Sequence, residues 1–245
     1  MTIQAALGND TVLGGNEDDS IFGNSGNDVL NGGGGDDILS GGDGDDTLVG
    51  GMDNDELRGD AGVDTVDYSG VAVAIVVNLA TNSASGGAGV DRLYDVERVV
   101  GTRFSDMLSG DGGNNILIGG VGNDLLAGGL GTDLMTGGVG NDRFVFNAAT
   151  DSRVGRTLTD RITDFTAGDI LDLSGIDANA GTTGTNEAFI QVAAFTRTAG
   201  ELTLAFDAAS NTTTLLGDTT GDGIADFSVL FTGNVAPAIT ANWVL

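Results

Sequence analysis

The chain has 245 residues, no Cys, no His and a formal net charge of −27 at pH 7, from 36 acidic and 9 basic residues. This charge repels nucleic acid and anionic membrane surfaces and favours cations as partners. Disulfides are excluded, and no apolar run approaches the roughly 18 residues that span a bilayer. We therefore expect no nucleic-acid partner and no membrane insertion.

The N-terminus, MTIQAALGND, has neither a basic region nor an apolar segment. A cleaved N-terminal signal peptide is therefore not expected, and on this ground alone the chain would be cytosolic. Strong acidity often marks disorder, but 40% of the residues are hydrophobic and they recur at regular places. The composition indicates a chain whose folding is conditional.

A nine-residue repeat runs from Gly14 to Val49 and reads GGNEDDSIF, GNSGNDVLN, GGGGDDILS and GGDGDDTLV. Its first position is Gly, its sixth is Asp and its eighth is aliphatic. The members of these three sets are Gly14, Gly23, Gly32 and Gly41; Asp19, Asp28, Asp37 and Asp46; and Ile21, Leu30, Leu39 and Leu48.

The same period extends in both directions from this stretch. It begins in a frayed form at AALGNDTVL, which keeps Asp10 and Val12, and it continues through GGMDNDELR and GDAGVDTVD with Asp55 and Asp64 in the sixth position. Residues 1–67 are therefore predicted to form a first repeat block.

The glycines become sparse over residues 68–100. The stretch VAVAIVVNL, Val71 to Leu79, alternates apolar residues and predicts a strand. The later stretch DRLYDVERVV is compatible with a short strand pair or a helical turn. We expect this segment to be a β insert that continues the sheet without metal-binding turns.

The period resumes at Gly101 and defines a second block over residues 101–146. Its sixth positions are Asp106, Asn115, Asp124, Asp133 and Asp142. Two departures stand out, because Phe104 occupies a fourth position that is usually Gly and Asn115 replaces a carboxylate. Phe144 and Phe146 predict that a thin core meets a bulkier cap.

Residues 147–245 alternate short apolar stretches and are predicted to form a C-terminal β cap. The predicted strands are Arg161 to Phe165, Ile170 to Leu173, Phe189 to Phe195, Leu202 to Phe206, Thr213 to Leu216 and Phe227 to Thr232. No stretch has the pattern of a long amphipathic helix.

The repeat itself predicts an all-β fold. Gly tolerates positive φ and Asp favours turns, so the first six residues are expected to form a tight turn that exposes backbone carbonyls. The last three form a strand whose central side chain faces inward. Two such units make a coil of eighteen residues, and stacked coils give a right-handed parallel β-roll.

Stacking places each turn over the second turn after it, so that carbonyls and Asp carboxylates form a cage of oxygen atoms. Such a cage suits Ca²⁺, whereas Mg²⁺ holds its water more tightly and zinc prefers the absent His or Cys. The carboxylates repel one another until a cation arrives. The blocks are therefore expected to fold when they bind Ca²⁺.

The repeated motif resembles that of the RTX (repeats-in-toxin) family, whose hemolysin-type repeats bind calcium. In that family one turn contributes carbonyls from positions two and four, the stacked turn contributes those from positions one and three, and both contribute their sixth-position Asp. Pairing turns in this way implies about eight Ca²⁺ ions, with the weakest site between Asn115 and Asp133.

The resemblance implies a set of calcium ligands in each block. In the first block they are Asp10, Gly15, Glu17, Asp19, Asn24, Gly26, Asp28, Gly32, Gly33, Gly34, Gly35, Asp37, Gly41, Gly42, Asp43, Gly44, Asp46, Gly50, Met52, Asp55, Gly59, Ala61 and Asp64. In the second block they are Asp106, Gly119, Gly120, Val121, Gly122, Asp124, Gly128, Leu130, Asp133, Gly137, Val139 and Asp142.

The tail sequences NDRFVF, DRITDFTAGDILDLSGID and DTTGDGIADFSVLFTG are similar to the region after the roll in serralysin-type secreted proteins. That resemblance implies a cap with an uncleaved C-terminal signal, export by the type I secretion machinery of Gram-negative bacteria, and an extracellular location. The chain ends in Asn242, Trp243, Val244 and Leu245, with Asn in place of the acid usual in such signals.

Two further acidic groups have competing interpretations. Asp218 to Asp226 resembles the start of an EF-hand loop, but Val229 stands where the bidentate Glu belongs, so a hairpin turn is favoured. The tail cluster of Asp160, Asp164, Asp169 and Asp172 is expected to serve turns and strand edges rather than metal.

No catalytic motif is recognisable, so the chain is predicted not to be an enzyme. We expect a calcium-binding, type I secreted RTX module. Two alternatives stay open: the noncatalytic C-terminal part of a larger secreted protease, lipase or epimerase, and an adhesin or surface-layer component that binds extracellular polysaccharide or cell surfaces.

Overall fold

The computed structural model describes residues 1–87, 89–155, 159–182, 187–239 and 243–244. It divides into two compact units, and each is described by itself. Unit 1 comprises Met1–Ser109 and Ile116–Asp124, and unit 2 comprises Gly110–Asn115 and Leu125–Leu245. Within the described ranges, no helix is long and apolar enough to cross a membrane.

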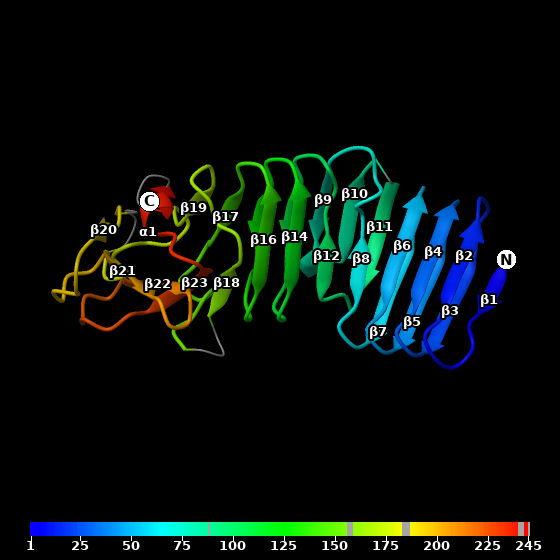
Figure 1. Cartoon of the computed structure of the whole chain (residues 1–245), viewed down its shortest axis with the longest axis horizontal. Coiled ribbons are helices and arrows are strands. Elements are labelled where there is room, and N and C mark those ends of the chain that lie inside the picture. Colours follow the sequence, from blue (N-terminus) through cyan, green and yellow to red (C-terminus); the bar gives the residue numbers. More distant parts are fainter. Residues whose placement is uncertain (88, 156–158, 183–186, 240–242, 245) are drawn as a thin grey trace. The chain divides into compact units, whose positions relative to one another are not determined.

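Unit 1 contains two sheets, and successive strands of the repeats alternate between them (Figure 1). The first sheet contains, in spatial order, β1 (Thr2–Gln4), β3 (Ser20–Ser25), β5 (Ile38–Asp43), β7 (Glu56–Ala61), β11 (Gly89–Tyr94), β10 (Ser83–Gly86), β9 (Ile75–Asn78) and β13 (Met107–Ser109). The second contains β2 (Thr11–Gly15), β4 (Val29–Gly34), β6 (Thr47–Met52), β8 (Thr65–Asp67), β12 (Arg98–Val100) and β14 (Ile116–Val121).

The register confirms the predicted coil of eighteen residues. β3 pairs in parallel with β5, with Ile21 opposite Leu39, and β4 pairs in parallel with β6, with Leu30 opposite Leu48. Repeats that are neighbours in sequence therefore contribute to different sheets. The predicted all-β parallel roll is confirmed.

The strands of the first block are longer than predicted. β3 to β7 each have six residues and extend through the first three positions of the expected turn. Gly33, for example, has φ 108° and still pairs with Gly15 and Gly51. A Cβ at Gly33 would collide with the Gly15 carbonyl, so glycine lets adjacent coils keep their hydrogen bonds here.

The eighth-position side chains form the core, as predicted. Ile21, Leu30, Leu39, Leu48, Leu57, Val66, Leu108 and Leu117 of unit 1 all have an exposed fraction of 0%. Leu126, Met135 and Phe144 of unit 2 are also fully buried. Val12 of the frayed repeat is half-buried, because β2 pairs with β4 alone.

The insert joins the first sheet as an antiparallel pair. β9 and β10 pair antiparallel, β10 pairs antiparallel with β11, and β11 returns to parallel pairing with β7. The predicted strand from Val71 to Leu79 is wrong in its first half, since β9 begins at Ile75 and Val73 is exposed. A 3-10 turn, η1 (Leu79–Thr81), ends it. DRLYDVERVV forms two strands, β11 and β12, rather than the helical turn, but they lie in different sheets and do not pair with each other.

Unit 2 has its own two sets of strands. One contains β15 (Leu125–Ala127), β17 (Arg143–Val145), β19 (Ile170–Asp172) and β24 (Trp243–Val244). The other contains β16 (Leu134–Val139), β18 (Asp160–Ile162), β23 (Phe227–Thr232), β22 (Thr212–Asp218), β21 (Glu201–Asp207) and β20 (Ile190–Gln191). A short helix, α1 (Ala236–Ile239), lies near the C-terminus.

The tail strands are confirmed in type but not in all their bounds. β18 ends at Ile162, and Phe165 beyond it is buried, with its ring centroid 5.9 Å from that of Phe144 and 5.4 Å from that of Phe231. The predicted strand Phe189 to Phe195 shortens to β20, which pairs with β21 over two residues. Of the predicted export signal, Trp243 and Val244 pair with β19, and Asn242 and Leu245 lie outside the described residues.

Candidate metal centres

A ladder of hydrogen bonds joins the sixth-position residues of stacked turns. In each rung the backbone N–H donates to Oδ1 of the Asp eighteen residues later. In the first block the N···O distances are 2.7 Å for Asp10 to Asp28, 2.8 Å for Asp19 to Asp37, 2.7 Å for Asp28 to Asp46, 2.9 Å for Asp37 to Asp55 and 2.8 Å for Asp46 to Asp64. We call this arrangement the Asp ladder.

The Asp ladder continues where the repeat is interrupted. The N–H of Asp55 donates to Asp91, 36 residues later, and that of Asp64 donates to the carboxylate of Glu97. In the second block the rungs are Asp106 to Asp124, Asn115 to Asp133, Asp133 to Asp160 and Asp142 to Asp169.

Sequence reasoning missed Asp91 and Glu97, and it gave Asp160 and Asp169 no place in the ladder. A signal existed for three of these residues. Asp91 follows its partner by 36 residues, and Asp160 and Asp169 follow theirs by 27, both multiples of nine. Glu97 follows Asp64 by 33 residues and carries no such signal.

The second carboxylate oxygen of many ladder residues is buried without a hydrogen-bond partner. This is true of Oδ2 in Asp28, Asp37, Asp46, Asp55, Asp64, Asp133 and Asp160. Each of these residues has an exposed fraction of 3% or less. A buried carboxylate oxygen with no donor costs free energy unless a cation or a proton compensates it.

The pKa values of several ladder carboxylates are raised, as expected for buried carboxylates without enough donors. Burial raises the pKa of Asp37 and Asp46 above the usual 3.8, against the lowering effect of the ladder hydrogen bond. Burial likewise raises the pKa of Asp55 to about 7 and that of Asp64 to about 6. Neighbouring ladder carboxylates add to these increases, because like charges lie close together.

Backbone carbonyls from the stacked turn face the same oxygens. A Cβ built on Gly23 would meet both Asp28 Oδ2 and the carbonyl oxygen of Gly41. A Cβ on Gly32 would likewise meet Asp37 Oδ2 and the Gly50 carbonyl. The first position must therefore be Gly, because a carboxylate of one turn and a carbonyl of the next converge against its Cα.

The same convergence extends into the insert. A Cβ on Gly59 would meet Asp64 Oδ2 and the carbonyl of Asp95, a residue with φ 51°. Asp95 therefore takes the place that a first-position Gly has in a regular turn. The turn at Asp95 thus places a carbonyl beside a carboxylate oxygen, and the expectation that the insert has no metal-binding turns stays a prediction.

The donor set fits Ca²⁺ in kind. Each stacked pair of turns brings two carboxylates together, and the other available oxygens are carbonyls, which are hard ligands of the type that Ca²⁺ prefers. Among the described residues, no group of three or more acidic side chains converges on one point.

Not every predicted turn has an oxygen that lacks a donor. The carboxylate of Asp106 accepts hydrogen bonds from the N–H of Ile75 at 2.9 Å, from the N–H of Thr102 at 2.6 Å and from the Thr102 hydroxyl at 3.0 Å. Asn115 Oδ1 accepts the N–H of Asp111 at 2.9 Å. These two turns differ from the regular ones.

The other acidic groups accept hydrogen bonds from the backbone or pair with Arg143. Asp218 accepts the N–H of Gly221 at 2.6 Å and that of Gly223 at 2.8 Å, in the loop between the antiparallel strands β22 and β23. The hairpin interpretation of this loop is therefore confirmed. In the tail cluster, Asp172 pairs with Arg143 and Asp164 accepts the N–H groups of Gly137 and Gly138.

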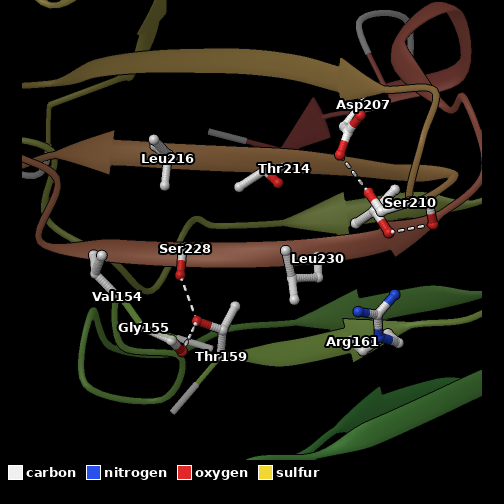
Figure 2. A pocket seen from close by; sticks show the side chains of 11 residues that line it. Val154, Gly155, Thr159, Arg161, Asp207, Ser210, Thr214, Leu216, Ser228 and Leu230 are labelled. Carbon is white, nitrogen blue, oxygen red and sulfur yellow. Dashed lines mark hydrogen bonds between the residues drawn. The ribbon is translucent and has the colours of Figure 1, made fainter. Parts of the chain in front are cut away.

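Unit 2 also has a shallow cavity of about 510 Å³ over β22 and β23 (Figure 2). The Thr159 hydroxyl in its wall is 2.7 Å from both the Ser228 hydroxyl and the Gly155 carbonyl, and Ser210 donates to Asp207. Val154, Leu216 and Leu230 give it an apolar floor. The hydroxyl groups of Thr159, Ser210, Thr212 and Ser228 are each hydrogen-bonded within the protein.

Comparisons with known proteins agree with this geometry. Residues 58–242 match the family described as peptidase M10 serralysin C terminal, and residues 4–39 and 31–66 match the RTX calcium-binding nonapeptide repeat (4 copies). Metallopeptidase AprA of Pseudomonas marginalis is 43% identical over 182 residues, which is 71% of this chain and 36% of that protein. Metalloprotease AprA of Pseudomonas entomophila (strain L48) is 43% identical over 183 residues, with the same coverage.

The chain thus spans about a third of the length of these curated relatives. Among solved structures, the AlgE6R3 subunit of the Azotobacter vinelandii mannuronan C5-epimerase is similar, with 29% identity, a TM-score of 0.43, and coverage of 60% of this chain and 76% of that one. The residues that match the serralysin C-terminal family, 58–242, cover most of the chain. This protein belongs to the peptidase M10 serralysin C-terminal family and carries RTX calcium-binding repeats.

Proposed function

We propose that this chain is the noncatalytic, calcium-binding C-terminal region of a longer secreted metalloprotease. The curated relatives are named as metalloproteases, and the chain matches about a third of their length. Its sequence has no His to act as a zinc ligand or as a general base. The comparisons favour this over a self-contained secreted module, the function first expected from the sequence.

One observation carries the calcium-binding part of the proposal. In turn after turn, a buried Asp oxygen without a hydrogen-bond donor faces a carbonyl of the stacked turn, as Asp28 and Asp37 do with the carbonyls of Gly41 and Gly50. A bound Ca²⁺ would supply the positive charge that these oxygens lack. The Asp carboxylates and turn carbonyls of the chain would hold it.

Calcium then governs folding. With the ladder carboxylates ionised, the stacked turns repel one another, and the thin core of one apolar side chain per repeat opposes that repulsion weakly. Binding to the folded state alone converts calcium affinity into folding free energy. The region would stay extended where calcium is scarce and fold outside the cell.

Circular dichroism with and without a chelator tests this directly. We expect strand signal in millimolar Ca²⁺, loss of most of it in the chelator, and no recovery in Mg²⁺ at the same concentration. Native mass spectrometry should count several bound ions. Unchanged strand content in the chelator, or fewer than about three bound ions, would contradict the proposal.

Export and the absence of catalysis need separate tests. A passenger protein joined in front of the full chain should leave a Gram-negative cell that carries a type I exporter and should remain inside an exporter-deficient strain. The purified chain should not cleave casein in the presence of Zn²⁺ and Ca²⁺. Casein cleavage would show that the region is itself an enzyme.

A further inference from the structure

The second residue of each turn divides the turns into two groups. In the first group this residue has a positive φ. Its members are Asn24 (74°), Gly33 (108°), Gly42 (111°), Gly51 (117°), Asp60 (70°), Gly120 (106°), Gly129 (92°) and Gly138 (99°). In six of these eight turns the Oδ2 of the sixth residue is buried without a donor: Asp28, Asp37, Asp46, Asp55, Asp64 and Asp133. The sixth residues after Gly120 and Gly138, Asp124 and Asp142, each make a further interaction.

In the second group the second residue lies outside the positive-φ set of the described chain and donates its own N–H to the sixth residue. The N–H of Ala6 donates to Asp10 Oδ2 at 3.0 Å, and that of Thr102 donates to Asp106 Oδ2 at 2.6 Å. The N–H of Asp111 donates to Asn115 Oδ1 at 2.9 Å.

Asp19 belongs to neither group. Gly15, its second residue, has no positive φ, and Asp19 Oδ1 lies 2.7 Å from the ammonium group of Met1.

The backbone explains why the two groups exist. The peptide between positions one and two carries the N–H of the second residue, and rotation about φ of that residue turns the N–H toward the carboxylate or away from it. Gly, Asn and Asp tolerate positive φ, whereas a β-branched residue does so at a steric cost. The identity of one residue therefore biases the peptide between two orientations.

The turn at Thr102 shows in full the orientation in which the N–H of the second residue points toward the carboxylate. Its N–H and its hydroxyl both donate to Asp106, and the N–H of Ile75 supplies a third bond. Asp106 is 1% exposed, so these three donors do for its carboxylate what a cation would do elsewhere. Both carboxylate oxygens of Asp106 therefore have donors without a cation.

We propose that the second residue of each turn decides whether that turn is a calcium site. In six of the eight turns with a positive φ at this position, a carboxylate oxygen is left for the ion. In the turns at residues 5–10, 101–106 and 110–115 the N–H of the second residue takes that place, and these turns hold no ion. The expectation that Asp10 and Asp106 are calcium ligands, drawn from the sequence, is thereby replaced, and each block holds fewer ions than its repeats suggest.

Asn24 offers a matched pair of variants in the full chain. It is exposed, and its side-chain amide donates to the Ala5 carbonyl at 2.8 Å, a bond that both Asn24→Gly and Asn24→Thr remove. Glycine keeps positive φ accessible and threonine disfavours it. Native mass spectrometry in Ca²⁺ should count as many ions for Asn24→Gly as for the unaltered chain and one fewer for Asn24→Thr.

A reciprocal pair at Thr102 keeps the test decisive if Asn24→Thr does not fold. Thr102→Gly frees the peptide to rotate and should gain one ion, whereas Thr102→Ser keeps the hydroxyl and should gain none. Equal ion counts within both pairs would overturn the inference.

The inference rests on the proposed calcium binding, and the two can fail separately. No calcium bound by the unaltered chain would refute both. Normal binding with equal counts for the paired variants would refute this inference alone.

Discussion

Asp46 has two separable roles, and two substitutions distinguish them. Its Oδ1 accepts the N–H of Asp28 at 2.7 Å, while its Oδ2 is a buried oxygen without a donor. Asp46→Asn keeps an oxygen for the ladder bond and removes the charge offered to calcium. Asp46→Ala removes both. The difference in stability between the two variants therefore measures the ladder bond.

The magnitude follows from burial. Asp28 and Asp46 are each 1% exposed, so water cannot replace the lost acceptor. Leaving a buried N–H without a partner costs about 1–3 kcal/mol. For a chain of this size each kcal/mol shifts the melting temperature by about 2–4 °C. In Ca²⁺, Asp46→Ala should therefore melt about 2–12 °C below Asp46→Asn.

Thermal unfolding followed by circular dichroism, at one fixed and saturating calcium concentration, measures this difference. Asp43 provides the control, because its side chain is exposed and makes no hydrogen bond in the part of the chain that the structure describes. Asp43→Asn and Asp43→Ala should agree within about 0.5 kcal/mol. Equal melting temperatures for the two Asp46 variants would show that the ladder bond contributes nothing to stability.

Two further predictions concern the core and the ladder charges. Leu39 is fully buried, so Leu39→Ala should lower the free energy of unfolding, measured with denaturant in Ca²⁺, by about 2–5 kcal/mol. Val29 is 42% exposed, so Val29→Ala should lower it by less than about 0.5 kcal/mol. Similar losses for the two variants would contradict the core assignment. Burial raises the pKa of Asp55 to about 7 and that of Asp160 to about 8, so the folded, metal-free chain holds protons that the unfolded chain releases. Its metal-free stability should be greatest below about pH 4 and fall as the pH rises through 6 to 8, while calcium binding weakens as the pH falls through the same window. More strand signal in chelator at pH 8 than at pH 5 would reverse the expected sign.

The nine-residue period predicts much of the fold because it acts through two local rules. Side chains alternate across a strand, so Leu30 and Leu48 must face the core once the register is set. The sixth-position Asp recurs with the same period, which places Asp28 over Asp46. Neither rule depends on distant parts of the chain.

What the sequence does not predict depends on non-local geometry. Asp91 and Glu97 enter the ladder because the antiparallel pair β9 and β10 is inserted between successive coils. No local sequence pattern predicts how many residues this insertion contains. Asp106 and Asp46 occupy the same repeat position and differ in the orientation of one peptide. The residue type at that position biases φ but does not fix it, as Asp60 and Asp111 show.

The two oxygens of each ladder carboxylate have different tasks, and this explains how regular and irregular turns coexist in one unit. One oxygen accepts the N–H of a stacked residue, in the repeats at Asp46 and in the insert at Asp91 alike. The other lacks a donor in Asp46, but in Asp91 it accepts the Tyr68 hydroxyl at 2.9 Å. In unit 2, Asp169 Oδ2 accepts the N–H of Thr166 at 2.6 Å.

The ladder bond is therefore the constant element of the roll, and the source of positive charge for the second oxygen is the variable one. A hydroxyl or an N–H serves where an insert or a β-branched residue interrupts the repeat, as at Asp91 and Asp106. Where Gly, Asn or Asp turns the peptide away, the second oxygen has no donor, as at Asp28. In the function that we propose, calcium supplies the charge there, so calcium dependence would be a property of individual turns and would grow with the number of turns that lack a donor.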